Sequence, residues 1–364
     1  MRVVAKRVLI PGAGGPGAVN LTRGLRMAPE PIFTVGCDAS PYYVHLALTH
    51  ERALVPRASD ESAYIEAIRD LLLRFDLNFL FPNSSVEMMV LTRHRDELPA
   101  RMLVPSLRTQ EVAASKWLTY QRWREAGIPV PRTVLIETPA DIERAFDEIS
   151  TRPVWFRGAG IPGRGVGMAA LPCRSPVEAL GWVTFHNGFG QFIASEYLPG
   201  ENLTFLGLFR RGRLVTSQGR ERDLYVIPHV SPSGITGAPA VCHTVHRDDL
   251  NDLGERAVLA VDPEFDGVAF VDFKGDAQGR ILPTELNAGR FGTTHHFYTV
   301  AGRNLPYYLL KLAFEEPLPE DLPRYNALPA DLYWIRTLDA GPVLLRGEDI
   351  RAHRGITSWT REYP

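Results

Sequence analysis

A predicted β-hairpin constrains this chain more than any other stretch. Residues 267–292 read GVAFVDFKGDAQGRILPTELNAGRFG. The segment 268–273 is rich in β-branched and aromatic residues, as strands are, and 281–286 is typical of a returning strand. Between them, 275–279 begins and ends with glycine, which favours a tight turn. The sequence therefore predicts two antiparallel strands joined by a short turn.

Three polar residues of this hairpin are positioned to meet. Side chains alternate between the two faces of a strand, so Glu285 and Asn287 share a face. A hairpin of this length also brings Asp272 beside them from the partner strand. Two carboxylates and an amide oxygen are hard ligands that suit Mg²⁺ together with substrate phosphates. The pattern predicts nucleotide chemistry, with an ordinary surface hairpin as the alternative.

Length and composition indicate a soluble protein of two or three domains that acts on small molecules. The chain has 364 residues, of which 45% are apolar and 23% are charged. Lys and Arg number 40 against 42 Asp and Glu, which gives a formal net charge of -2. Because there is no basic excess, neither a nucleic acid nor an anionic membrane is expected as a partner.

Cysteine usage and short apolar runs favour a cytoplasmic protein. Cys37, Cys173 and Cys242 are odd in number and far apart, unlike the cysteines of a disulfide scaffold or a zinc site. The apolar run 8–10 ends at a Pro-Gly pair and is too short for the core of a signal peptide. No run approaches the roughly 18 apolar residues of a transmembrane helix.

The N-terminal part of the chain alternates short apolar runs with helical stretches, which predicts a parallel α/β sheet. The order resembles half of a doubly wound domain, with ligands expected at the carboxyl edge of the strands. The predicted strands are 8–10, 33–37, 53–56, 79–81 and 102–104.

A glycine pattern follows the first of these strands. Gly12, Gly14 and Gly17 match G-x-G-x-x-G, and Asp38 ends the second strand, as in a dinucleotide-binding fingerprint. Glycines here also serve any ligand that approaches a helix N-terminus, so a substrate carboxylate or phosphate near Gly14 and Gly15 is the preferred interpretation.

The fourth predicted strand ends in polar residues. Asn83, Ser84 and Glu87 lie at the carboxyl edge of the sheet, where open α/β folds bind ligands. A helix N-cap formed by Asn83 or Ser84 explains the same pattern equally well.

Two further segments carry features of phosphate contacts. A helix is predicted at 111–127, and Lys116 on it is either solvated or a phosphate contact. Arg157 ends a strand and precedes 158–167, a loop rich in glycine that can bring backbone amides close to a polyphosphate. The loop lacks the G-K-[ST] ending of a P-loop, and a mobile hairpin tip is the alternative.

Further along, the strand 192–198 ends in a turn, and a second strand follows at 203–209. The exposed backbone of such a crossing can imitate a base-pairing edge for adenine.

These motifs in order resemble the ATP-grasp superfamily. They are Lys116 before G-I-P-V-P, Arg157 before the glycine-rich loop, S-E-Y-L-P-G-E-N, and D-F-K-G-D-A-Q-G-R-I-L-P-T-E-L-N-A-G-R. The resemblance covers most of the chain and looks greatest for the carbamoyl-phosphate-synthase-like branch. That branch includes single-chain carboxylate-amine ligases such as the pyrrolysine-pathway ligase, and Arg157, where many relatives have Lys, supports it.

The resemblance implies an α/β fold that is α+β in the ATP-grasp part. A Rossmann-like substrate domain is expected at 1–108 and an ATP-grasp domain with a glycine-rich lid at 109–318. The lid subdomain is expected at about 128–198. A C-terminal extension at 319–364 is expected to pack on the ATP-grasp core.

The resemblance also implies roles for individual residues. The implied ATP-binding residues are Lys116, Arg157, Gly160, Gly163, Gly165, Gly167, Glu196, Tyr197, Leu198, Glu201 and Asn202. The implied metal ligands are Asp272, Glu285 and Asn287, and the implied catalytic cations are Arg157 and Arg290. The candidate substrate contacts, chosen by their position alone, are Gly14, Gly15, Asn83, Ser84, Glu87, Arg220 and Arg222. Two positions depart from the family: Asn202 stands where relatives have a ribose-binding Glu, and Arg290 follows Asn287 by three residues instead of two.

The implied activity is ATP-dependent ligation of a carboxylate to an amine through an acyl-phosphate, which releases ADP and phosphate. ATP and Mg²⁺ are the expected cofactors, with Mn²⁺ as a substitute. The expected partners are a small carboxylate and a small amine, and a homodimer is left open. Three alternatives remain: activation of bicarbonate or carbamate, a dehydrogenase that uses the N-terminal glycines, and a non-catalytic nucleotide-binding protein.

Overall fold

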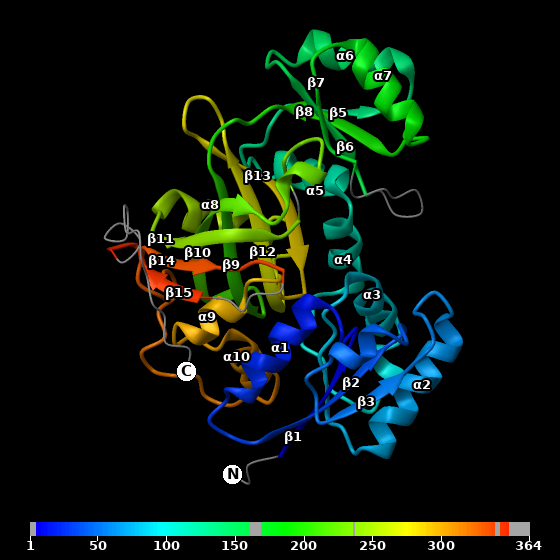
Figure 1. The fold of residues 1–364 in the computed structure, drawn as a ribbon, viewed down its shortest axis with the longest axis vertical. Coiled ribbons are helices and arrows are strands. Elements are labelled where there is room, and N and C mark those ends of the chain that lie inside the picture. The colour runs from blue at the N-terminus through cyan, green and yellow to red at the C-terminus, as the bar shows by residue number, and fades with distance from the viewer. Residues whose placement is uncertain (1–4, 161–168, 236, 339–342, 349–364) are drawn as a thin grey trace, which may run out of the picture.

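The computed structural model of the protein describes residues 5–160, 169–235, 237–338 and 343–348. The described residues form three β-sheets, which Figure 1 separates clearly: a small sheet at the top, a seven-stranded sheet in the middle and a parallel sheet at the lower right. None of the helices in these residues is long and apolar enough to cross a membrane.

The N-terminal sheet is parallel, as predicted. Its strands are β1 (Lys6–Pro11), β2 (Ile32–Asp38), β3 (Glu51–Leu54) and β4 (Phe79–Leu80), in the order β3-β2-β1-β4. The helices are α1 (Pro16–Arg26), α2 (Glu61–Arg74) and α3 (Ser85–Arg93), with the 3₁₀ turns η1 (Tyr43–Leu46) and η2 (Arg95–Glu97). In β1, Val8 and Ile10 pack in one core and Leu9 in another on the opposite face. Burial of both faces explains why the strand reads as a continuous apolar run.

A predicted fifth strand at 102–104 is wrong. Arg101 alone forms an isolated bridge with Phe79. Its N–H donates to the carbonyl of Asn78 at 3.1 Å, and its own carbonyl accepts from Leu80 at 2.8 Å. The chain then leaves the sheet through Pro105, which has no N–H to continue a ladder.

The single helix predicted at 111–127 is also wrong, because it is two helices. α4 (Leu107–Ala114) and α5 (Lys116–Glu125) are separated by Ser115, which has an extended backbone at φ -112° and ψ 112°. The Ser115 hydroxyl accepts from the N–H of Leu118 at 3.2 Å and caps α5. The backbone N–H of Lys116 donates to the carbonyl of Ala159 at 2.7 Å, so a contact with a distant segment stabilises the break.

The small sheet at the top of Figure 1 falls within 128–198, the segment predicted as a lid, and is named the lid sheet for that reason. Its strands are β5 (Thr133–Ile136), β6 (Val154–Gly158), β7 (Leu171–Cys173) and β8 (Phe192–Glu196), in the order β5-β8-β6-β7. Helices α6 (Pro139–Glu148) and α7 (Pro176–Phe185) share a separate apolar core with this sheet. The other face is therefore free to take part in a site.

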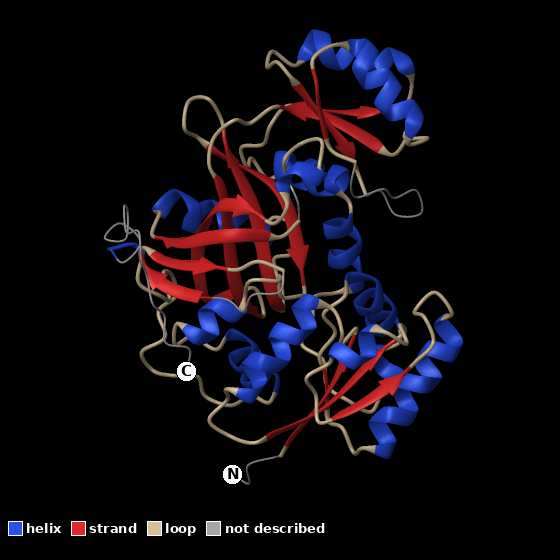
Figure 2. Cartoon of the chain, viewed as in Figure 1, coloured by secondary structure: helices blue, strands red, loops and turns tan. Residues whose placement is uncertain are grey.

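The central sheet is antiparallel, and Figure 2 shows its strands surrounded by helices. Its order is β13-β12-β9-β10-β11-β14-β15, with the bounds β9 (Asn202–Arg210), β10 (Arg213–Tyr225), β11 (Pro239–Val245), β12 (Gly267–Gly275), β13 (Ile281–Ala288), β14 (Leu332–Ile335) and β15 (Val343–Arg346). The helices are α8 (Asp248–Leu259), α9 (His296–Val300) and α10 (Leu305–Ala313), with the turn η3 (Pro228–Val230). Along β9, Phe205 and Phe209 pack in the core with α8, whereas Leu206 and Leu208 pack in the core with α10.

The predicted hairpin is confirmed as β12 and β13. Asp272 pairs directly with Glu285, and a bulge follows at Thr284, since Phe273 pairs with Pro283. The bulge leaves the Thr284 hydroxyl to donate to the Asp272 carbonyl at 3.1 Å.

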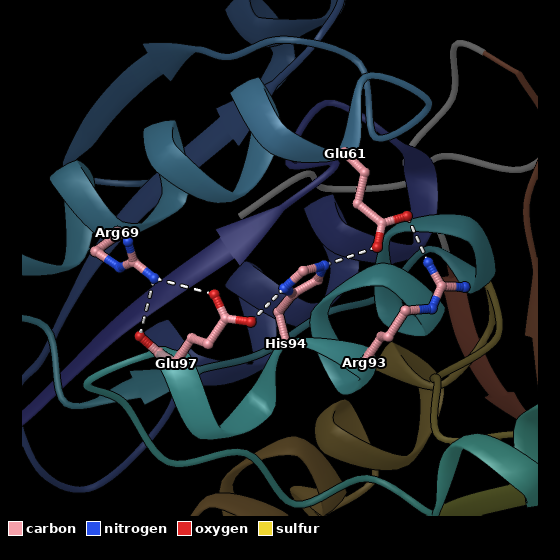
Figure 3. Close-up of polar contacts among 5 residues, drawn as sticks. All are labelled: Glu61, Arg69, Arg93, His94 and Glu97. Atoms are coloured by element: carbon pink, nitrogen blue, oxygen red, sulfur yellow. Dashed lines mark hydrogen bonds and ion pairs between the residues drawn. The ribbon is translucent and has the colours of Figure 1, made fainter.

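A surface network joins α2 to the end of α3 (Figure 3). His94 lies 2.7 Å from both Glu61 and Glu97, which in turn contact Arg93 and Arg69. Hydrogen bonds to Glu97 and then to Glu61 raise the pKa of His94 above its ordinary value. Because these groups are largely solvated, the network orients the helices without adding much stability.

Candidate active site

The largest group of predicted site residues meets in one cavity of about 940 Å³. The cavity lies between the lid sheet and the central sheet, because its walls come from β6, β8, β10, β12 and β13. Its lining includes Trp155, Arg157, Glu196, Tyr197, Leu198, Asn202, Arg220, Arg222, Tyr225, Asp272, Lys274, Thr284, Glu285, Asn287 and Arg290.

The three predicted metal ligands line this cavity together, and Asp272 and Glu285 are cross-strand neighbours. The carboxylate of Glu285 lies 3.3 Å from the Lys116 ammonium, and that of Asp272 lies 3.0 Å from the Arg222 guanidinium. Burial acts to raise the pKa of Glu285, but Lys116 and Arg157 hold it below its ordinary value. Glu285 is therefore an anion in this site.

The donor set fits a hard divalent cation that binds together with a phosphate. Among the described residues, no group of three His, Cys, Asp or Glu side chains has the arrangement of a metal site. Two carboxylates and the Asn287 oxygen are all that the hairpin offers, and Arg290 donates to that oxygen. Mg²⁺ commonly uses one or two carboxylates and completes its shell with water and substrate phosphates.

Lys116 and Arg157 reach the hairpin from two different elements. Lys116 begins α5, and the helix break at Ser115 is what turns it toward Glu285. Arg157, near the end of β6, donates to the Thr284 carbonyl at 2.5 Å and lies 4.0 Å from Glu285. Burial, and then the neighbouring Arg157, lower the pKa of Lys116 while Glu285 opposes the shift. The site thus holds two closely spaced cations ready for an anion.

The segment predicted to hold adenine lies at the lid end of the cavity. Glu196, Tyr197 and Leu198 all line it. The Tyr197 N–H already donates to the Thr151 hydroxyl at 2.9 Å, whereas the Leu198 carbonyl accepts from Lys274 at 3.3 Å. The segment is therefore held by a contact from the loop before β6 and by one from the central sheet.

Several predicted ATP contacts are not brought to the cavity lining. Glu201 forms an ion pair with Arg247, and its neighbour Asn202 faces the cavity instead. Gly160 packs under α4, where a Cβ would lie 2.5 Å from the Ala114 carbonyl. The positions of Gly163, Gly165 and Gly167 lie outside the described residues.

Of the predicted substrate contacts, Arg220 and Arg222 line the cavity. Asn83 does not, since its amide bonds the backbone of Phe291, accepting at 2.9 Å and donating at 3.3 Å. Ser84 occupies the N-cap position of α3. The structure therefore separates the N-terminal candidates from the central site.

The N-terminal glycine loop is occupied by the protein's own groups. One Asp38 oxygen accepts from the Gly14 N–H at 3.1 Å and the other from the Ser40 N–H at 2.8 Å. A Cβ on Gly14 would lie 1.9 Å from the Tyr43 carbonyl, so the glycine is needed for packing, and next to it Gly15 is the N-cap of α1. These contacts favour a structural role over the ribose contact of a dinucleotide site.

Glu87 lies beside this loop in an environment of low polarity. It accepts a hydrogen bond from the Tyr64 hydroxyl at 3.1 Å, and no described Lys, Arg or His pairs with it. Burial raises the pKa of Glu87 to about 7, and the nearby Asp38 charge adds to the shift.

Some residues of the cavity were not predicted from the sequence. Lys274 lies two positions after Asp272, so strand alternation was a usable signal for it. Thr204 donates to Asp272 at 2.9 Å from β9, a strand pairing that only the fold reveals. Thr284 enters the site through the bulge, for which Pro283 is a weak sequence sign.

The sequence matches no protein-family model and no curated protein. Solved structures do resemble it. An L-amino acid ligase from Bacillus licheniformis has a TM-score of 0.65 at 16% identity, over 90% of this chain and 78% of that one.

Two other similar structures carry nucleotides. The biotin carboxylase domain of a Hydrogenobacter thermophilus 2-oxoglutarate carboxylase, a dimer with MgADP and bicarbonate, has a TM-score of 0.67 at 17% identity, over 92% and 74% of the two chains. An N5-carboxyaminoimidazole synthase from Aspergillus clavatus, in complex with ADP and 5-aminoimidazole ribonucleotide, has a TM-score of 0.65 at 15% identity, over 91% and 81%. At such identities the likeness concerns the fold.

Proposed function

We propose that this chain, which has the ATP-grasp fold of the ligases and carboxylases compared above, is an ATP-dependent carboxylate-amine ligase. It would activate a carboxylate as an acyl-phosphate and couple it to an amine, releasing ADP and phosphate. The observation that carries the proposal is the meeting of Lys116 and Arg157 at the carboxylate of Glu285, which lines one cavity together with Asp272.

Each residue has a role that follows from its charge and place. Asp272, Glu285 and Asn287 would hold Mg²⁺, or Mn²⁺ in its place, which when bound neutralises phosphate oxygens as a Lewis acid. Lys116 and Arg157 are buried cations beside this set and would contact the triphosphate. Glu196, Tyr197, Leu198 and Asn202 would surround the adenosine.

The first chemical step is phosphoryl transfer. A carboxylate oxygen of the substrate attacks the γ-phosphorus, the bond from that phosphorus to the β–γ bridging oxygen breaks, and ADP leaves. Negative charge on the transferred oxygens is met by Arg157 and Arg290, so the protein acts through position and electrostatics. No covalent enzyme intermediate is required.

The second step forms the amide. The amine nitrogen attacks the acyl carbon, the carbon–oxygen bond to the phosphate breaks, and the nitrogen loses a proton. Water would destroy the acyl-phosphate, so its exclusion falls to the lid subdomain, for which we propose residues 128–198. The other proposed boundaries are 1–108 for the substrate domain, 109–318 for the ATP-grasp domain and 319–364 for the extension.

A second candidate is activation of bicarbonate to carboxyphosphate or carbamate. The likeness to a carboxylase domain solved with MgADP and bicarbonate favours it, because the same phosphate-binding groups would serve. We also propose a cytoplasmic enzyme, with a homodimer as a further possibility.

The test is a screen of acids and amines for ADP release by the purified protein. A ligase releases ADP only when an organic acid and an amine are both present, and the amide appears in equal amount. ADP release that depends on bicarbonate alone selects the second candidate. ATP binding without ADP release under any mixture would identify a non-catalytic nucleotide-binding protein.

A further inference from the structure

Arg220 is a buried cation that lines the cavity and has no role in the proposed ATP site. It lies on β10 two positions before Arg222, and only 7% of the residue is exposed. Arg222 is neutralised by Asp272, whereas Arg220 forms no ion pair with any carboxylate of the described residues. Its Nε is buried without a hydrogen-bond partner. A buried charge without a counter-ion is costly, which indicates that an anion belongs beside it.

A second guanidinium makes this position more positive. Arg336 donates to the Pro239 carbonyl at 2.9 Å and to the Thr293 hydroxyl at 2.8 Å, and it too has no carboxylate partner among the described residues. Burial and then the Arg220 charge lower the pKa of Arg336. Pro239 and Thr293 line the cavity, so both guanidinium groups lie at one wall.

The acidic residues of β10 cannot supply the missing counter-ion, because they are on the opposite face. Glu221 and Asp223 alternate with the two arginines, and Asp223 pairs with His243 at 3.0 Å on that face. The charged residues that this strand presents to the cavity, Arg220 and Arg222, are therefore both basic.

Sheet register gives the distance of this position from the reaction centre. Arg220 and Asp272 both pair with Thr204, from opposite sides of β9. Two strand spacings separate their backbones, roughly 10 Å. At this backbone spacing, a group beside Arg220 can belong to the same small molecule as the carboxylate that is phosphorylated, or to the amine that attacks it.

We infer that Arg220, with Arg336 behind it, binds a second carboxylate: one of the two substrates is a dicarboxylic acid or an amino acid whose carboxylate does not react. The inference rests on the proposed ligase function and adds the class of substrate. A guanidinium forms strong, charge-assisted hydrogen bonds with a carboxylate. The low local dielectric of a buried position strengthens these bonds.

Matched pairs of substrates test it. On the acid side, butyrate is compared with succinate and hexanoate with adipate; on the amine side, isopropylamine is compared with alanine. The variants are Arg220→Met, which removes the charge, Arg220→Lys, which keeps it, and Arg213→Met as a control at the exposed end of the same strand. ADP release gives KM and kcat for each pair.

The expected result is that the wild-type protein prefers the compound with the additional carboxylate by tenfold or more, either among the acids or among the amines. Arg220→Met should raise KM for that member by about ten- to a hundredfold and leave its neutral counterpart and ATP nearly unchanged. Arg220→Lys should recover part of the preference, and Arg213→Met should behave as wild type. Equal losses for both members would mean that Arg220 holds the reacting carboxylate, which overturns the inference. So would a wild-type enzyme with no preference.

Calorimetry separates this inference from the ligase proposal. Succinate, adipate and alanine are titrated into the protein with Mg²⁺ and a non-hydrolysable ATP analogue, with Arg220→Gln, which also removes the charge, used if the Met variant does not fold. Binding that depends on the Arg220 charge supports the second carboxylate even where no ADP is released, in which case only the ligase proposal fails. Binding that is absent, or that is equal in wild type and variant, overturns the inference.

Discussion

Lys116 and Glu285 form an ion pair of 3.3 Å that joins the start of α5 to β13. The two residues are 169 positions apart in the chain, and Glu285 lines the cavity between the lid and central sheets. Arg157 approaches the same carboxylate from β6. A triphosphate that enters this cavity would meet cations that share the Glu285 carboxylate.

The first prediction concerns Lys116. Lys116→Met keeps the length of the side chain and removes its charge, so it should weaken MgATP binding by about ten- to a hundredfold through the loss of a charge-assisted contact. Isothermal titration with MgATP measures this. Arg122→Met on the exposed side of the same helix is the control and should bind as wild type. An unchanged affinity in Lys116→Met would remove this residue from the nucleotide site.

The second prediction distinguishes the nucleotide. A ligand that binds only the native protein raises its melting temperature by mass action. MgATP should therefore raise Tm well above the effect of NADH at the same concentration, since both Asp38 oxygens are engaged by backbone N–H groups. Thermal shift measurements decide it, and a larger shift with NADH would contradict the ATP assignment.

The third prediction concerns the helix break. Ser115→Ala removes the cap of α5 and should cost about 1 kcal/mol of stability. Because the cap also orients Lys116, MgATP affinity should fall as well. Ser175→Ala removes the equivalent cap of α7 and should cost similar stability without a change in affinity. Urea unfolding and titration together test this, and equal affinities in the two variants would show that the break does not position Lys116.

The fourth prediction concerns the pH dependence that Glu87 confers. Its pKa in the folded protein is about 7, above the ordinary 4.5. Between these pH values the folded state keeps a proton that the unfolded state has released, so stability falls as pH rises through this window. Glu87→Gln cannot ionise and should be more stable than wild type at pH 8, by on the order of 1–3 kcal/mol, with the gain gone at pH 4.

Urea unfolding at the two pH values measures this difference. Glu66→Gln on the exposed face of α2 is the control and should show no such gain. Parallel stability curves for wild type and Glu87→Gln would contradict the assigned pKa.

Local patterns in the sequence were sufficient for the hairpin. Alternation and turn glycines predicted β12 and β13, and with them the pairing of Asp272 and Glu285. The bulge at Thr284 was not predictable, because it depends on how β13 fits its partner strand. The α/β fold expected from motifs spread over the chain agrees with the fold of the similar structures.

Contacts between distant segments explain what the sequence did not reveal. At the helix break, Lys116 donates a hydrogen bond to the distant Ala159, and a single N-cap residue, Ser115, was the one local sign of it. The same limit applies to Glu201, whose partner Arg247 lies 46 residues away. Arg220 could be named as a substrate contact from its position, but its lack of a counter-ion is visible only once the fold brings β10 beside β9 and β11.

The central claim is that the Asp272, Glu285 and Asn287 set supports phosphoryl transfer from ATP. Glu285→Gln keeps the size of the side chain and removes one anionic ligand, so the protein should still fold. Binding of Mn²⁺ with ATP, followed by electron paramagnetic resonance, should weaken. Asn287→Asp, which retains an oxygen, should have a milder effect than Asn287→Ala.

The most direct measurement is kcat for ADP release with an active acid and amine pair, compared between wild type, Glu285→Gln and the surface control Glu264→Gln. Loss of charge stabilisation that grows during phosphoryl transfer should lower kcat of Glu285→Gln by on the order of a hundredfold or more, with a smaller effect on nucleotide affinity. Glu264→Gln should match wild type. Folded Glu285→Gln protein with near-normal turnover would mean that the hairpin is structural and that the ligase mechanism is wrong.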